Sequence, residues 1–129
     1  PNSYVEIEPP QDALVKLMFY DSEDTLEQEM NFSEDQYYEG EAQVERTEDF
    51  GQWGNYTGLG RSYRMNVEGE QLTVRIFIMP VAEGFYFEVQ ELVNRDVEGL
   101  LQPGLERVRS SFRLKVGDDG QGGLMFGDQ

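Results

Sequence analysis

The chain has 129 residues, a formal net charge of −16, and neither histidine nor cysteine. This length favours a single domain. The two missing residue types exclude disulfides, thiol nucleophiles, thiolate metal sites, imidazole bases and zincin motifs. With 26 acidic and 10 basic side chains, the acidic balance also argues against direct nucleic-acid binding, because phosphate contacts need clustered lysine and arginine.

The negative charge is concentrated in the first half of the chain. Residues 1–60 carry 15 acids and two bases, a net charge of −13. Residues 61–129 carry 11 acids and eight bases, a net charge of −3. The only basic cluster in the second half is formed by Arg95, Arg107, Arg109, Arg113 and Lys115.

No transmembrane segment is expected. The longest nearly apolar run, residues 76–82, is far shorter than the roughly 20 residues that a spanning helix needs. No signal-peptide pattern is present. The compartment is left open, cytoplasmic or exported, because a signal or a lipid anchor could have been removed.

Two strands are expected at the start of the chain. Residues 5–8 alternate apolar and acidic side chains until a proline pair ends the segment. Residues 14–20 predict a second strand and residues 21–24 a turn.

The next segment, residues 26–32, fits two structures. Alternate residues predict a strand, whereas one face of a helix would carry Leu26, Met30, Ser33 and Tyr37. We favour the strand, because Ser33 and Gln36 resemble a capping box for a short helix that starts there. Residues 41–48 predict a further strand, and residues 50–60, with four glycines, predict a loop.

A meander of three antiparallel strands is predicted in the second half. Residues 63–67 and 72–78 alternate apolar and polar side chains around the turn Glu68-Gly69. Phe77 and Met79 indicate that the second face of this hairpin is partly covered as well. A second turn and a third strand follow at residues 80–84 and 85–90.

A helix is expected after the meander, because apolar residues recur at three- and four-residue steps. These residues are Val97, Leu100, Leu101, Leu105, Val108 and Phe112. Asp96 is a good N-cap. Because Pro103 would remove a hydrogen bond from a helix interior, we expect the regular helix to start near it, after one loose turn.

Residues 1–116 are therefore expected to form one α+β domain, followed by a tail at residues 117–129. Leu114 and Val116 predict an extended exit from the helix. The tail is rich in glycine and acid, which is typical of flexible chain. Its one apolar tripeptide, residues 124–126, is expected to anchor it on this domain or on a neighbouring molecule.

Three constellations are candidates for function. The acidic stretch at residues 21–41 could bind a hard cation such as Ca²⁺, although it lacks EF-hand spacing, and the alternative is a solvated acidic face. No spacing singles out a carboxylate pair for hydrolysis. We therefore expect no metal, no cofactor and no catalytic residue.

The second constellation is aromatic. Trp53 and Tyr56, flanked by glycines, could form a binding surface for a small ligand or carbohydrate together with nearby Tyr63. The alternative is that Trp53 and Tyr56 pack over the edge of the sheet.

The third constellation is basic. Arg107, Arg109 and Arg113 could form a patch for an anion or an acidic partner, including the acidic half of a second copy in a homodimer. The alternative is that arginine near a helix C-terminus complements the helix dipole.

From Tyr56 onward the chain resembles the PsbP-like α/β/α family. The resemblance rests on Gly58-x-Gly60, the meander and a helix that ends in Arg109-Ser110-Ser111-Phe112-Arg113, with an extended start at residues 5–10. The family includes the photosystem extrinsic protein, the Ran-binding nuclear import factor, bacterial lipoproteins and secretion-effector chaperones. Its members mostly bind proteins, so the resemblance implies a binding module without catalytic residues.

The expected fold is α+β. It has a mainly antiparallel, twisted sheet of five to seven strands, a C-terminal amphipathic helix on one face and a short helix elsewhere. The expected function is that of a non-enzymatic, acidic protein-binding or accessory domain. Its partner would present a basic or apolar surface. The alternative function is a small-ligand or carbohydrate-binding module that uses the aromatic constellation.

Overall fold

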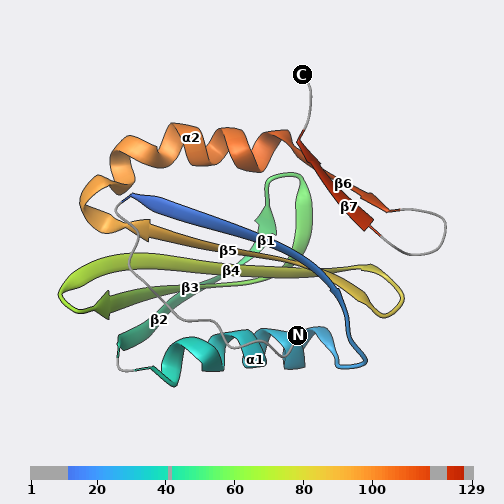
Figure 1. The fold of residues 1–129 in the computed structure, drawn as a ribbon, viewed down its shortest axis with the longest axis horizontal. Helices are drawn as coiled ribbons and strands as arrows, with labels where there is room; N and C mark the ends of the chain where they lie inside the picture. The colour runs from blue at the N-terminus through green and yellow to red at the C-terminus, as the bar shows by residue number, and fades with distance from the viewer. Residues whose placement is uncertain (1–11, 41, 117–121, 127–129) are drawn as a thin grey trace.

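The computed structural model describes residues 12–40, 42–116 and 122–126. It is an α+β fold built on one antiparallel sheet with the strand order β1-β5-β4-β3-β2 (Figure 1). The strands of this sheet are β1 (Ala13–Asp21), β2 (Gln43–Trp53), β3 (Tyr56–Val67), β4 (Glu70–Ala82) and β5 (Phe85–Asn94). The predicted strand at residues 5–8 lies outside the described residues.

The predicted meander is confirmed in β3, β4 and β5. Residues Glu68 and Gly69 form the first turn with positive φ angles of 54° and 86°, as a tight hairpin between twisted strands requires. Alternate side chains of β4 point to opposite faces, and both faces are covered. Phe77 and Met79 are therefore buried like the apolar residues on the opposite side of the strand.

The segment after β1 is a helix, α1 (Leu26–Tyr38), so the strand that we favoured there is wrong. Its capping box is formed by Thr25 and Gln28 instead of Ser33 and Gln36. Each of these two side chains satisfies a backbone N–H of the other residue, which leaves Ser33 free to face the sheet. The face of α1 that carries Met30, Ser33 and Tyr37 is the buried face, as the helical alternative required.

The predicted loop at residues 50–60 is also wrong, because β2 and β3 form a hairpin whose turn is Gly54-Asn55. The glycines permit close packing. A Cβ on Gly60 would lie 2.4 Å from the ring of Phe50. Gly54 has a φ of 58°, and a Cβ there would lie 2.1 Å from the carbonyl oxygen of Arg109. The hairpin tip therefore packs directly on the end of the second helix.

That helix, α2 (Glu98–Ser111), follows a 3₁₀ turn, η1 (Arg95–Val97). It starts before Pro103 and includes it, so the expected start near the proline is wrong. Asn94, and not Asp96, supplies the side-chain cap, and it caps the 3₁₀ turn. The predicted apolar face is only partly used: Leu105 is buried, whereas Leu100 is 81% exposed.

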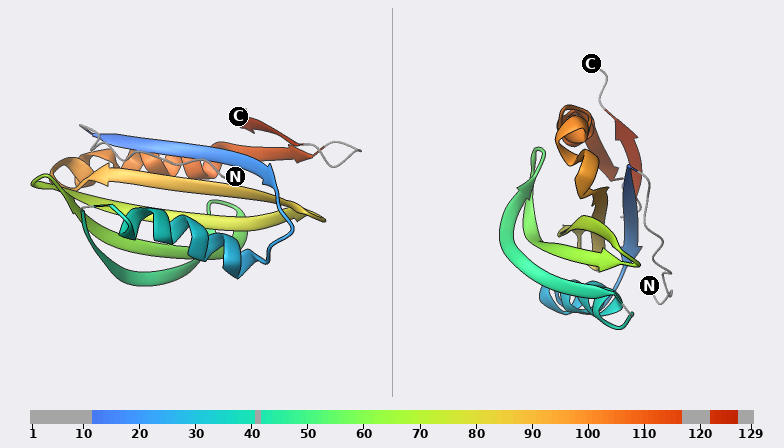
Figure 2. Two further views of the ribbon diagram at one scale, coloured as in Figure 1. Left: turned by 60° about the horizontal axis from the view of Figure 1, so that its bottom comes forward. Right: turned by 90° about the vertical axis from the view of Figure 1, so that its left-hand side faces the viewer.

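The two helices lie on opposite sides of the sheet (Figures 1 and 2). On the α1 side, Met30 and Tyr37 pack on apolar residues of β3, β4 and β5. On the α2 side, the core is an aromatic cluster: Phe50, Trp53, Tyr56, Phe77, Phe87 and Phe112. Because α2 buries little apolar surface of its own, part of the sheet face below it is left open.

A separate two-stranded sheet follows α2. It consists of β6 (Phe112–Val116) and β7 (Gly122–Phe126), which pair antiparallel. The predicted extended exit from the helix is therefore confirmed. The apolar tripeptide of the tail lies in β7, so its backbone is held by β6.

Candidate functional site

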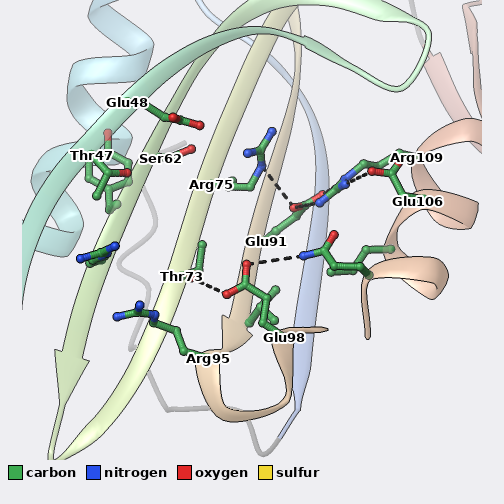
Figure 3. Close-up of a pocket in the computed structure, with 15 residues that line it drawn as sticks. Thr47, Glu48, Ser62, Thr73, Arg75, Glu91, Arg95, Glu98, Glu106 and Arg109 are labelled. Atoms are coloured by element: carbon green, nitrogen blue, oxygen red, sulfur yellow. Dashed lines mark hydrogen bonds and ion pairs between the residues drawn. The ribbon is translucent and has the colours of Figure 1, made fainter. Parts of the chain in front are cut away.

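A row of polar residues crosses the α2 side of the sheet. The strand registers align Glu48 with Ser62, Ser62 with Arg75, and Arg75 with Glu91, on β2, β3, β4 and β5 in turn. Directly opposed residues share a face, so these four side chains all point toward α2. Figure 3 shows these side chains running across the strands toward α2. We call these four residues the polar row.

Glu91 is the most buried member of the polar row, at 1% exposure. Arg109 of α2 donates to both of its oxygens, from Nη2 at 2.9 Å and from Nε at 3.0 Å. The indole Nε1 of Trp53 donates to Oε2 at 2.7 Å. Burial raises the pKa of Glu91, but the hydrogen bonds from Arg109 and Trp53 outweigh it and leave this pKa below the ordinary value of 4.5. Glu91 is therefore an ionised anchor for α2.

A polar groove of about 560 Å³ separates α2 from the polar row. Its walls come from β2, β3, β4, β5, η1 and α2. Four of the chain's eight arginines and four glutamates line it (Figure 3). These charged residues are Arg64, Arg75, Arg95, Arg109, Glu48, Glu91, Glu98 and Glu106. In a chain of net charge −16, this groove is a local region of balanced charge.

Two polar groups inside the groove have no hydrogen-bond partner among the described residues. They are Oγ of Ser62 and Nε of Arg75. Ser62 is only 5% exposed. Arg75 lies 3.6 Å from Glu91 as an ion pair, and its guanidinium stacks 3.9 Å above the ring centroid of Phe50. Buried polar groups are nearly always paired, so these two adjacent groups are unusual.

The aromatic residues predicted as a ligand surface are placed in the core instead. Trp53 is 1% exposed and packs against Phe77, Phe87 and Phe112. Tyr56 is half-buried against Phe112. The packing alternative therefore describes both residues. Tyr63 points to the α1 side, where its hydroxyl donates to Glu34 at 2.8 Å, so the structure does not bring it together with Trp53.

The three arginines predicted as one basic patch lie in different surroundings. Arg109 reaches into the groove, whereas Arg107 is exposed on α2 and does not line it. Arg113 is exposed beyond the helix and donates to the carbonyl oxygens of Ser110 and Phe112. Arg113 therefore caps the helix end, as the dipole alternative describes.

Sequence reasoning missed Ser62, Arg75 and Glu91. A signal for them exists in the meander. Arg75 shares its strand face with Phe77 and Met79, and that face was already expected to be partly covered. A charged side chain on a covered face must be paired or must line a polar cavity. The same reasoning applies to Glu91, which follows the alternating segment of the third strand.

The acidic stretch of residues 21–41 is divided between two environments. Glu29 and Glu34 face the sheet, where Glu34 pairs with Arg46 and Arg61. The other described acids of this stretch are exposed, at the end of β1, in the turn before α1, on the outer face of α1 and at its C-cap. Within residues 12–40, 42–116 and 122–126, no acidic cluster has the arrangement of a metal site. None of the described helices is long and apolar enough to cross a membrane.

A second buried carboxylate lies on the α1 side. Glu88 is 2% exposed and accepts hydrogen bonds from Tyr20, Ser33 and Gln90, each at 2.7 Å. Burial raises its pKa, and the nearby Glu29 adds to this, against the effect of the three donors. All three donors to Glu88 are neutral groups, whereas Glu91 accepts hydrogen bonds from the cationic side chain of Arg109.

Comparison with protein-family models, with curated proteins and with solved structures finds no match to this chain.

Proposed function

We propose that this chain is a non-enzymatic binding domain that holds a segment of a partner polypeptide in the groove below α2. The observation that carries the proposal is the pair of unpartnered polar groups, Ser62 Oγ and Arg75 Nε, at the floor of an open groove. Leaving a buried polar group unpaired costs about 1–3 kcal/mol. A bound segment would pair these groups and recover that cost.

The chemistry of the groove supports binding rather than catalysis. A serine nucleophile needs an adjacent base within hydrogen-bond distance. Ser62 Oγ has no such partner among the described residues, and the chain contains no histidine. The buried carboxylate Glu91 is occupied by Arg109 and Trp53, so it is not available to move a proton.

The acidic surface supports a partner that is basic outside the groove. Exposed acids line the outer side of α1 and the edge strand β2, at Glu27, Asp35, Glu39, Glu45 and Asp49. Such a surface would steer a partner with a basic or apolar face, and the association would weaken as salt increases. The small-ligand alternative has less support, because Trp53 is buried in the aromatic cluster.

Two further expectations remain proposals. Membership of the PsbP-like family is supported by the short motif at the end of α2 and by helices on both sides of the sheet.

A homodimer is supported by the acidic α1 surface and the exposed Arg107, and light scattering at low and high salt would test it. A mass that is the same at both salt concentrations would count against charge-driven pairing.

The proposal is tested by placing a photo-crosslinking amino acid at single positions. Gln102 lines the groove, whereas Glu27 is exposed on α1. In lysate from cells that produce the protein, we expect a partner to crosslink from Gln102 and not from Glu27. The same crosslink should be lost when Arg75→Gln is added and kept when Arg107→Gln is added. A crosslink from Glu27 alone would move the binding surface to the α1 side and refute the proposal.

A further inference from the structure

The deepest part of the groove contains a cation without a hydrogen-bonded anion. Each guanidinium nitrogen of Arg109 already donates a hydrogen bond, Nε and Nη2 to Glu91 and Nη1 to Glu106 at 2.9 Å. The two oxygens of Glu91 already accept three hydrogen bonds, from Arg109 and Trp53. Arg75 approaches the same carboxylate at 3.6 Å without a hydrogen bond. Arg75 is therefore the groove arginine whose donors have no acceptor at its floor.

Ser62 stands directly opposite Arg75 in the strand register. Directly paired residues on one face have Cβ atoms about 4.5–5.5 Å apart, so one small group can touch both side chains. Figure 3 shows Ser62 and Arg75 side by side on neighbouring strands; Ser62 Oγ and Arg75 Nε are covered from solvent, whereas the Arg75 side chain as a whole is 26% exposed to the groove. The floor therefore presents a guanidinium and a hydroxyl donor toward a common point.

We infer that this floor is a subsite for a carboxylate, held by the guanidinium of Arg75 and the hydroxyl of Ser62. A carboxylate oxygen accepts hydrogen bonds from both kinds of donor, and a planar carboxylate matches the donor geometry of arginine. The inference rests on the proposed function and names the group by which the partner segment enters the groove.

The charge around the subsite favours a carboxylate over a phosphate. Glu48 and Glu106 lie at the rim, and Glu98 lies on the α2 wall. A dianionic phosphate would be repelled by these three carboxylates as well as by Glu91. A carboxylate carries a single charge and is repelled less, and Arg75, whose ion pair with Glu91 is made without a hydrogen bond, keeps its donors for it. Phe50, stacked beside Arg75, holds the guanidinium in place for this contact.

Titration of the ¹⁵N-labelled protein with four probes tests the inference. The first is a short capped peptide with one central glutamate, and the second is the same peptide with glutamine. The third is the glutamine peptide with a free C-terminal carboxylate, and the fourth is inorganic phosphate. We expect the amide signals of Ser62 and Arg75 to shift with the glutamate peptide. The glutamine peptide should bind at least about tenfold more weakly.

The third probe distinguishes the two sources of the carboxylate. If the third probe binds as tightly as the capped glutamate peptide, the subsite accepts the carboxylate of a chain terminus. If the third probe binds more weakly, the subsite is selective for the carboxylate of a side chain. Either result supports the inference. Equal binding of the capped glutamate and glutamine peptides at the groove would overturn the assignment of the subsite to a carboxylate. It would leave the proposal of a binding groove in place. Tighter binding of phosphate than of either carboxylate, or no shift with any probe, would also overturn it.

Three variants locate the contact. Arg75→Gln should weaken the glutamate peptide by about tenfold or more, and Ser62→Ala should weaken it by a smaller factor. Arg107→Gln removes the same charge from an exposed position outside the groove and should leave the affinity unchanged. Because Ser62 Oγ has no internal partner, Ser62→Ala remains informative even where Arg75→Gln disturbs the fold. An unchanged affinity in both groove variants would place the peptide elsewhere and refute the site itself.

Discussion

Two buried serines illustrate how the α1 side and the α2 side of the sheet differ. Ser33 and Ser62 are each 5% exposed. Ser33 donates to the carboxylate of Glu88 at 2.7 Å, whereas the hydroxyl of Ser62 has no partner among the described residues. The α1 side is thus closed by internal hydrogen bonds, whereas the α2 side keeps an unpaired hydroxyl, which the proposed binding function would use.

Substituting alanine at these two serines should have different effects on stability. Ser33→Ala removes a hydrogen bond to a charged group and should lower the free energy of unfolding by about 1.5–3 kcal/mol. Ser62→Ala removes an unpaired polar group and should leave the free energy of unfolding unchanged or raise it by up to about 1 kcal/mol. Urea unfolding measures both. A loss in Ser62→Ala as large as that in Ser33→Ala would show that Ser62 is internally paired.

At the scale of elements, the patterns with one strong period were predicted well from sequence. The meander and its first turn follow from alternation around Glu68-Gly69, which demands positive φ angles. The segment of α1 satisfied both a period of two and a period of 3.6. Its helix is selected by Thr25, whose cap with Gln28 is a local hydrogen bond that competes against a strand.

The candidate site was harder to predict because its parts meet only through the fold. The glycines around Gly54 indicated a loop, although they serve close approach to the end of α2. Trp53 and Arg109 were assigned to separate hypotheses, and both hydrogen bond to Glu91. Strand register, which aligns Ser62 with Arg75, depends on pairing between distant segments and has no local signature.

The contact between the β2–β3 turn and α2 predicts the effect of Gly54→Ala. Gly54 and Gly69 both have positive φ, but only Gly54 has a neighbour that a Cβ would meet. Gly69→Ala should cost about 1 kcal/mol of backbone strain. Gly54→Ala should cost about 2–3 kcal/mol or more, because the turn must also move away from Arg109. Equal losses in thermal unfolding would contradict this contact.

The attachment of α2 through Glu91 predicts a difference between two arginines of the same helix. Arg109→Gln removes the only cation that hydrogen bonds to the buried carboxylate of Glu91 among the described residues and should cost about 3–5 kcal/mol. The exposed Arg107 is the control, and Arg107→Gln should change stability by less than about 0.5 kcal/mol. Adding Glu91→Gln to Arg109→Gln should recover part of the loss. Additive losses in this double-mutant cycle would mean that the two side chains are not coupled.

At the scale of the whole molecule, the buried carboxylates determine how stability depends on pH. The pKa values of Glu34 and Glu91 are lowered, in both cases because hydrogen bonds outweigh burial. Their contribution is therefore present above about pH 4.5 and is lost as pH falls through their folded values. The pKa of Glu88 is raised by burial, so its contribution is present below about pH 4.5 and is lost as pH rises through its folded value.

The melting temperature should therefore rise from strong acid and then fall above about pH 4.5 as Glu88 ionises. No histidine is present to add a transition near neutral pH. Glu88→Gln should flatten the falling part of the profile. Glu27→Gln removes the same charge from the exposed surface of α1, and this variant should keep the falling part of the profile. The same fall in both variants would assign the pH dependence to general charge repulsion instead of to Glu88.

The central claim is that a partner segment enters the groove below α2 through a carboxylate. The most direct measurement is competition between the capped glutamate peptide and the photo-crosslink formed from Gln102. We predict that saturating glutamate peptide abolishes the crosslink and that the matched glutamine peptide leaves it intact. A crosslink that persists while the glutamate peptide saturates the groove would contradict the claim.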